Sequence, residues 1–230
     1  MSEPVSVLFL ERQIRIKLLM MKKIMYNDNC GLTQLAVSGK KTLTSRIEPG
    51  LKSAEAIQKV NDNLFIVTDA DGNQSEFRPR LKKGEIVAIA MNYQTIGMDH
   101  LDPDFFLLKT ANSHNVFLED VSSLPGLKNK MFVKAELMPY RQEVVDIHIE
   151  RLSDINDEDC IKEGIEYIRL TENLKGYGFF EADKKRYLNF ETPQKAFKRL
   201  IEKTCGRKIW KENPFVVRYQ MKKISKNDRR

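Results

Sequence analysis

Hydrophobic and polar positions alternate with the two-residue period of a β-strand in part of this chain. Between residues 145 and 150 the odd positions are apolar and the even positions polar, which predicts a strand over 144–152 with one face in water. After Glu85 an apolar run continues to Met91 and predicts a strand buried on both faces. Further strands are expected at 131–137 and 215–224, together with a hairpin over 63–80 that turns at Asp71-Gly72-Asn73.

Other segments carry the signals of short helices. Residues 192–206 combine a threonine cap, a first-turn proline, an apolar stripe and a final glycine. A shorter apolar stripe over 33–37 ends at Gly39, and a helical pattern is also present over 51–60. A helix after Asp157, capped by Asn156 or Asp154, is expected to end at Glu163.

The order of these elements predicts an α+β fold. Strands that are separated by irregular connections, with little βαβ alternation, indicate a mixed sheet or small barrel. Because no linker divides the chain, we expect a single domain over residues 21–224. Segments near 94–127 and 168–191 read as irregular insertions, residues 1–20 as an N-terminal extension, and residues 225–230 as a basic tail.

Charge is unevenly distributed along the 230 residues. The chain has 39 Lys and Arg against 32 Asp and Glu, a net charge of +7. From Asp183 to the C-terminus, however, 16 basic residues face only five acidic ones. Such a basic face attracts polyanions, so RNA or a nucleotide is the first partner class to consider. The alternative is an ordinary solvated helix face.

Residues that would indicate other function classes are sparse. The three cysteines have no C-x-x-C spacing and fit reduced structural thiols, which favours a cytoplasmic location. No run approaches the ~20 apolar residues of a membrane span. We predict no metal, because the three histidines lack ligand spacing and Asp69-x-Asp71-Gly72 fits a β-turn better than a calcium loop. We also predict no cofactor, since the sequence has no glycine-rich phosphate loop or dinucleotide fingerprint.

The turn after Gly39 concentrates cations and hydroxyls. In an extended segment Thr42, Thr44 and Arg46 would share one face and could converge on an anion or a base edge with Lys40 and Lys41. Arg46 offers a planar fork for phosphate, whereas Lys41 could act as a point charge or, if desolvated, as a proton acceptor. The alternative is that these are solvated residues following a helix.

Two further residues are candidates for ligand contact. Tyr93 belongs to a set of aromatic side chains that could stack on bases, and Arg141 follows the segment Met138-Pro139-Tyr140. Packing in a core or loop is the alternative for the aromatic residues.

Three segments in this order resemble one family. They are the glycine-lysine-threonine turn at 39–44, the glutamate-glycine helix end at 163–164, and Trp210 followed by Asn213-Pro214 at a strand entrance, where Asn213 is expected to tie down backbone. The chain resembles ASCH-domain proteins of the larger bacterial and phage type over about 21–224. This resemblance implies a PUA-like mixed β-barrel flanked by short helices.

The resemblance also implies a catalytic set. In the small ASCH enzymes that resemble acetylcytidine amidohydrolases, a lysine, a threonine three residues later and a downstream glutamate act together. The matching positions are Lys41, Thr44 and Glu163. Carried over, Thr44 would be the nucleophile, Lys41 its activating base, and Glu163 the acid that protonates the leaving amine.

Three functions therefore remain open from the sequence. The first is an RNA- or nucleotide-binding module whose pocket is lined by the residues of the 39–46 turn and Glu163. The second is an amidohydrolase of an acylated nucleoside. The third is an accessory interaction protein of a phage or mobile element.

Overall fold

The computed structural model describes residues 21–98, 103–114, 122–169, 171 and 175–224. These residues fold into a mixed α+β structure, as the sequence predicts, in which the strands form three sheets. None of these sheets closes into a barrel within the described ranges. The predicted extension at 1–20 and the tail at 225–230 lie outside the described residues. Among the helices that are described, none has the length and apolar character needed to cross a membrane.

The chain forms two compact units, whereas its sequence predicts one domain with insertions. Of the described residues, those within 21–26 and 86–142 form unit 1, and those within 27–85 and 143–224 form unit 2. Segment 94–127, expected as an insertion, falls within unit 1. Strand β7 (Arg141–Arg151) begins in unit 1 and continues into unit 2.

Unit 1 is built around the buried strand β6 (Ile86–Ile89), which pairs in parallel with β1 (Lys23–Ile24). Two helices follow, α3 (Tyr93–Met98) and α4 (Pro103–His114). The strand expected at 131–137 is wrong, since two 3₁₀ turns occupy Lys130–Phe132 and Ala135–Leu137. The Asn129 side chain accepts the N–H of Met131 at 2.9 Å, and such a local bond favours a turn over a sheet ladder.

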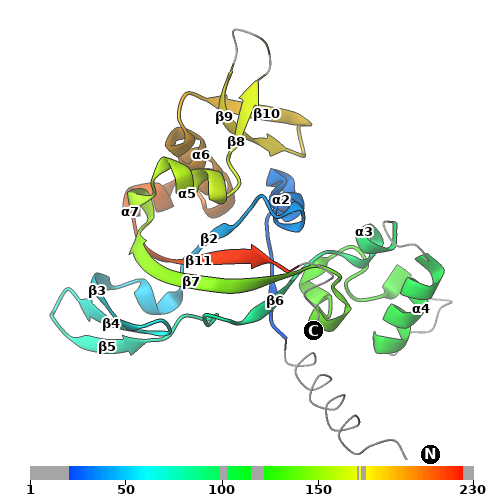
Figure 1. Ribbon diagram of the computed structural model, residues 1–230, viewed down its shortest axis with the longest axis horizontal. Helices are drawn as coiled ribbons and strands as arrows, with labels where there is room; N and C mark the ends of the chain where they lie inside the picture. Colours follow the sequence, from blue (N-terminus) through cyan, green and yellow to red (C-terminus); the bar gives the residue numbers. More distant parts are fainter. Residues whose placement is uncertain (1–20, 99–102, 115–121, 170, 172–174, 225–230) are drawn as a thin grey trace, which may run out of the picture. The chain divides into compact units, whose positions relative to one another are not determined.

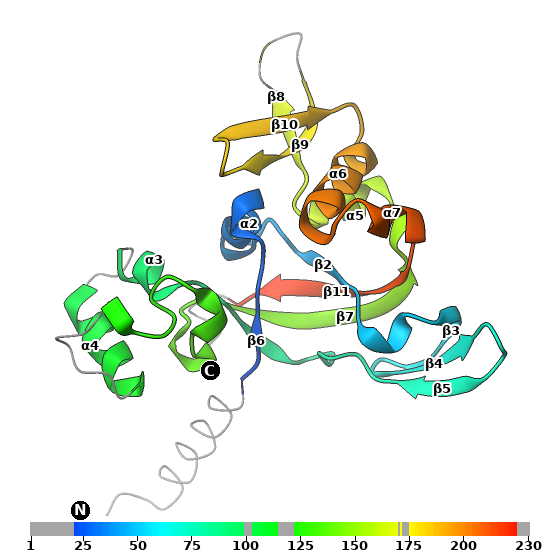
Figure 2. The ribbon, with the colours of Figure 1, turned by 180° about the vertical axis from the view of Figure 1, so that it is seen from behind.

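The central sheet of unit 2 contains β7, β11 (Phe215–Lys223) and β2 (Leu43–Arg46), in this order. Figures 1 and 2 show these strands side by side, with β7 curving along its length. The two predicted strands at 144–152 and 215–224 are confirmed. Strand β2 pairs only with β11 and therefore forms the edge of this sheet.

A second sheet of unit 2 contains β3 (Ala54–Asn61), β4 (Leu64–Asp69) and β5 (Gln74–Phe77). The hairpin predicted over 63–80 is confirmed, and it turns between Asp69 and Asn73. The helix predicted over 51–60 is wrong, because residues 54–60 belong to β3, which pairs with β4 apart from two register shifts. Cross-strand pairing outweighs a weak helical pattern here.

The third sheet contains β8 (Glu166–Arg169), β9 (Lys175–Glu181) and β10 (Arg186–Phe190). The prediction that 168–191 is irregular is wrong for these residues. Gly176 and Gly178 lie on β9, and because glycine is uncommon in strands the sequence pattern did not predict one here. The neighbouring strand comes so close that there is no room for a side chain at these positions. A Cβ at Gly178 would lie 1.6 Å from the Leu188 carbonyl oxygen.

Helix α6 (Pro193–Cys205) packs against this third sheet and is followed by α7 (Lys208–Glu212). The helix predicted over 192–206 is confirmed, with the Thr192 side chain accepting from the Lys195 N–H. The Asn213 side chain accepts a hydrogen bond from the N–H of Ser153 at 2.8 Å. This confirms the prediction that Asn213 fixes a segment of backbone. The remaining helices of unit 2 are α2 (Leu32–Ser38) and α5 (Asp157–Lys162).

Candidate functional site

The turn that carries Lys41 starts at the end of α2. Gly39 adopts the left-handed conformation, with φ of 87°, and its N–H bonds to the Ala36 carbonyl, which ends the helix. The backbone then leads into β2, and the Lys41 side chain turns inward. Only 2% of Lys41 is exposed. Sequence alone predicted the turn, but it left open whether this lysine is buried.

The Lys41 ammonium contacts Glu163, the residue that ends α5. Its Nζ lies 2.6 Å from Glu163 Oε2, 2.6 Å from the Glu163 carbonyl oxygen and 2.8 Å from the Leu43 carbonyl oxygen. These three acceptors match the three N–H donors of an ammonium. The structure thus brings together two of the three residues that the family resemblance grouped.

Burial makes this ion pair expensive to break. Desolvation lowers the pKa of the Lys41 ammonium from its ordinary value, and the adjacent Glu163 carboxylate opposes that shift. A buried pair whose other lone pairs and protons are also hydrogen-bonded is held firmly, whereas either partner alone would leave an uncompensated charge. We call this ion pair, with its bonds to the Leu43 and Glu163 carbonyls, the Lys41–Glu163 brace.

The brace also covers the open edge of β2. The Leu43 carbonyl accepts from Lys41, and the Ser45 N–H donates to Glu163 Oε1 at 2.5 Å. The Thr42 N–H adds a bond to the Lys162 carbonyl. Edge strands present such groups to any other chain unless something covers them. The Lys41–Glu163 brace and the end of α5 therefore fix the backbone of residues 42–45.

The other predicted residues of the turn lie around this brace. Thr44 is buried and stands opposite Tyr219 of β11, while Arg46 is half-buried on the same face of β2. Thr42 is half-buried just before the strand. Lys40 is exposed and pairs with Glu166 at 3.2 Å.

Tyr93 and Arg141 belong to unit 1, whereas the turn belongs to unit 2. The Tyr93 side chain is fully buried, and its hydroxyl contacts His114 Nε2 at 2.8 Å and accepts the Lys134 N–H at 2.7 Å. Burial raises the pKa of Tyr93 to about 12. Tyr93 thus packs in the core of its own unit, the alternative considered for it from the sequence. Arg141 begins β7 and is half-buried.

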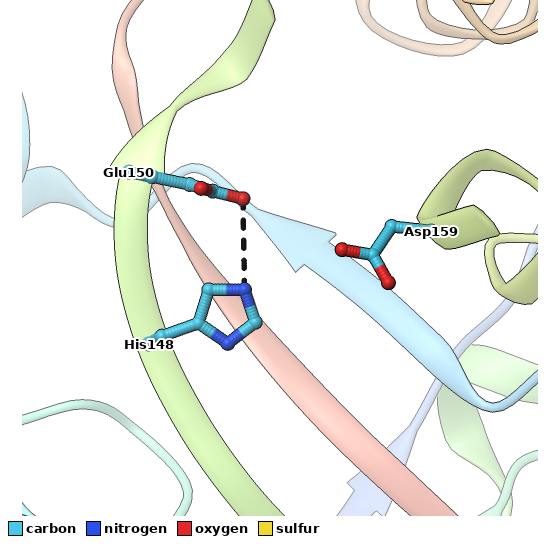
Figure 3. A group of neighbouring side chains, drawn as sticks. All are labelled: His148, Glu150 and Asp159. Carbon is cyan, nitrogen blue, oxygen red and sulfur yellow. Dashed lines mark ion pairs between the residues drawn. The ribbon is translucent and has the colours of Figure 1, made fainter. Parts of the chain in front are cut away.

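A polar cluster on unit 2 was not predicted from the sequence. His148 and Glu150 project from the same face of β7 toward Asp159 of α5 (Figure 3). Beside them Arg218 of β11 is completely buried, with its Nε 2.5 Å from Glu150 Oε1. The i, i+2 spacing of His148 and Glu150 was a usable signal. The approach of α5 was not predictable from spacing.

Four exposed cations lie on α6, on α7 and at the turn between these helices: Lys198, Arg207, Lys208 and Lys211. None of the four forms an ion pair with another residue in the described part of the chain, and Lys198 Nζ lies 6.0 Å from the ring centroid of Trp210. We call this set the α6–α7 basic surface. It contributes four of the 16 basic residues that the sequence places after residue 183.

Comparison with known proteins adds no assignment. No family model, no curated protein and no solved structure matches this chain.

Proposed function

We propose that this chain is an RNA- or nucleotide-binding domain of the ASCH type with a PUA-like architecture. The observation that carries the proposal is the buried Lys41–Glu163 brace. The ASCH resemblance groups these two residues although they are 122 positions apart, and they lie in direct contact. Their contact is what the resemblance leads us to expect.

The geometry favours binding over catalysis. A lysine that activates a threonine must offer a free lone pair, whereas the Lys41 ammonium donates to three protein acceptors. Thr44, the proposed nucleophile, is 3% exposed. In our proposal the brace holds the turn rigid, and ligand contacts come from the more accessible residues Lys40, Thr42 and Arg46.

Electrostatics supports an anionic ligand. The α6–α7 basic surface offers unpaired cations beside an aromatic ring, the combination that single-stranded nucleic acids use through phosphate contacts and base stacking. Phosphate contacts there would supply affinity, while the turn would contact an individual nucleotide. An amidohydrolase acting on a neutral nucleoside has no need of this surface.

The proposal is tested by fluorescence anisotropy with a short labelled single-stranded RNA. We expect Arg46→Ala to weaken binding by about tenfold or more, as loss of one charge-assisted contact does. The control Arg78→Ala removes an exposed arginine that pairs with Glu76 and should change little. Acetylcytidine turnover is followed on the same preparations. Turnover that is lost in Lys41→Ala, combined with no RNA binding, would replace the proposal by the amidohydrolase.

A further inference from the structure

The cluster of His148, Glu150 and Asp159 has the composition of a metal site. Each residue offers one ligand atom, and these atoms all lie within 4.8 Å of one another. Two come from alternate positions of a strand and the third from the first turn of a helix, so the backbone fixes all three (Figure 3). An imidazole with two carboxylates is a donor set that Zn²⁺ accepts.

The distance between the first two ligands is informative. His148 Nε2 lies 3.5 Å from Glu150 Oε1, which is longer than the ~2.9 Å of a good N–H···O hydrogen bond. Two ligands at about 2.05 Å from a tetrahedral zinc ion lie about 3.3 Å apart. The observed spacing therefore fits two ligands of one shared ion.

Neighbouring side chains contact and orient both carboxylates, as is usual for the ligands of metal sites. Arg218 Nε contacts Glu150 at 2.5 Å, while the Asn156 amide and Lys162 donate to Asp159 at 3.2 and 3.1 Å. These contacts orient the carboxylate oxygens of Glu150 and Asp159 and leave each of them lone pairs that can bind an ion. Arg218 and Lys162 also reduce the net negative charge, so we expect moderate affinity.

A second, independent observation concerns Arg218. Its side chain is 0% exposed, and its Nε contacts Glu150 only as an ion pair. Neither Nε nor Nη1 has a hydrogen-bond acceptor among the described residues, and neither has the buried hydroxyl of Ser45. These two residues are direct partners across β11 and β2. Buried donors without acceptors are costly and call for an explanation. A water or ligand oxygen on a bound ion would supply the acceptor.

We propose that His148, Glu150 and Asp159 bind one divalent transition-metal ion, Zn²⁺ in the first instance. A fourth position is left for a water or a ligand oxygen next to Arg218. All three side chains retain partial solvent exposure, so the ion has access. The site is independent of RNA binding, and its test does not depend on that proposal.

The test is isothermal titration calorimetry of chelator-treated full-length protein with ZnCl₂ and, separately, MnCl₂. The Cys205→Ser variant serves as the parent, because the exposed thiol of Cys205 could itself bind zinc. We expect one ion per chain, and at least tenfold weaker binding in His148→Ala and in Asp159→Asn. His114→Ala, in unit 1, is the matched control and should bind as the parent does.

His148 is partly exposed, so its replacement should leave the fold intact, which circular dichroism checks. Saturable binding that is lost in His148→Ala but kept in His114→Ala supports the site. The absence of saturable binding of either metal, or binding unaffected by His148→Ala, overturns it.

Discussion

Lys41 and Glu163 are separated by 122 positions in the chain, and their side chains meet at 2.6 Å in the interior of unit 2. The pair joins the start of β2 to the end of α5 and covers the backbone of an edge strand. Its position explains why a lysine and a glutamate, both residues of the surface in most proteins, are almost fully enclosed here.

Removing one member of this pair should be strongly destabilising. Glu163→Ala leaves the Lys41 charge buried without a counter-ion, and we expect a loss of about 3–5 kcal/mol in the free energy of unfolding. Urea denaturation followed by circular dichroism measures it. The control Glu166→Ala breaks the exposed pair with Lys40 and should cost less than about 1 kcal/mol. Similar losses in the two variants would show that the brace is not structural.

Gly164, which follows Glu163, is a position where an added side chain should destabilise the fold. It has φ of 107°, and an added Cβ would lie 2.9 Å from Leu32 Cδ2. Gly164→Ala therefore combines backbone strain of about 1–2 kcal/mol with overpacking of about 1–3 kcal/mol. Gly72→Ala measures the backbone strain alone, because Gly72 also has a positive φ but open space around it. Unfolding free energies of the two variants should differ by at least about 1 kcal/mol, and equal values would contradict this packing.

Acid should destabilise the contact between β9 and α6. Glu181 is buried among cations, and hydrogen bonds from Lys203 and Arg186, with the charge of Lys184 nearby, lower the pKa of its carboxyl to about 2. In the unfolded chain this group titrates near 4.5. The unfolded state thus binds more protons between these values, and the stabilisation is lost as the pH falls from about 4.5 to 2.

The urea midpoint measured from pH 5 to pH 2 tests this account of Glu181. Glu181→Gln should flatten the pH dependence in that window, while Glu212→Gln, at an exposed position, should leave it steep. A wild-type slope that is retained in Glu181→Gln would assign the acid sensitivity to other carboxyls.

Cysteine reactivity should separate one thiol from the other two. Burial raises the pKa of Cys30 to about 11 and that of Cys160 to about 12, while Cys205 is exposed. Thiolates are the reactive species, so native protein should react with one equivalent of Ellman's reagent. Cys205→Ser should abolish the fast reaction, and three thiols should appear in denaturant. Rapid labelling of two or more thiols in the native wild type would contradict the burial.

The sequence predicted the elements whose periodicity is clean. The alternation in β7, the hairpin turn between β4 and β5, and the capped amphipathic helix α6 are each fixed by residues within one segment. Strand β3 was read as a helix because only pairing with β4 selects the extended form. Strand β9 escaped notice because its glycines, which permit close strand approach, look like breaks.

The candidate site was predictable only where a family resemblance supplied long-range information. Nothing in local spacing links Lys41 to Glu163, and it was the resemblance that paired them. His148 and Asp159 had no such guide, because their proximity depends on the tertiary placement of α5. Likewise, the completely buried Arg218 is set by tertiary packing, and a strand pattern alone predicts no buried charge.

The central claim, binding of RNA or a nucleotide, is tested most directly by the salt dependence of affinity for a single-stranded RNA. Fluorescence anisotropy of the wild type should show affinity that falls steeply as salt rises. The double variant Lys208→Glu/Lys211→Glu should lower the slope of log affinity against log salt by about 1.4, since each lost phosphate contact removes about 0.7. The exposed Lys52→Glu is the control. No binding by the wild type at low salt, or a slope unchanged in the double variant, would contradict the account.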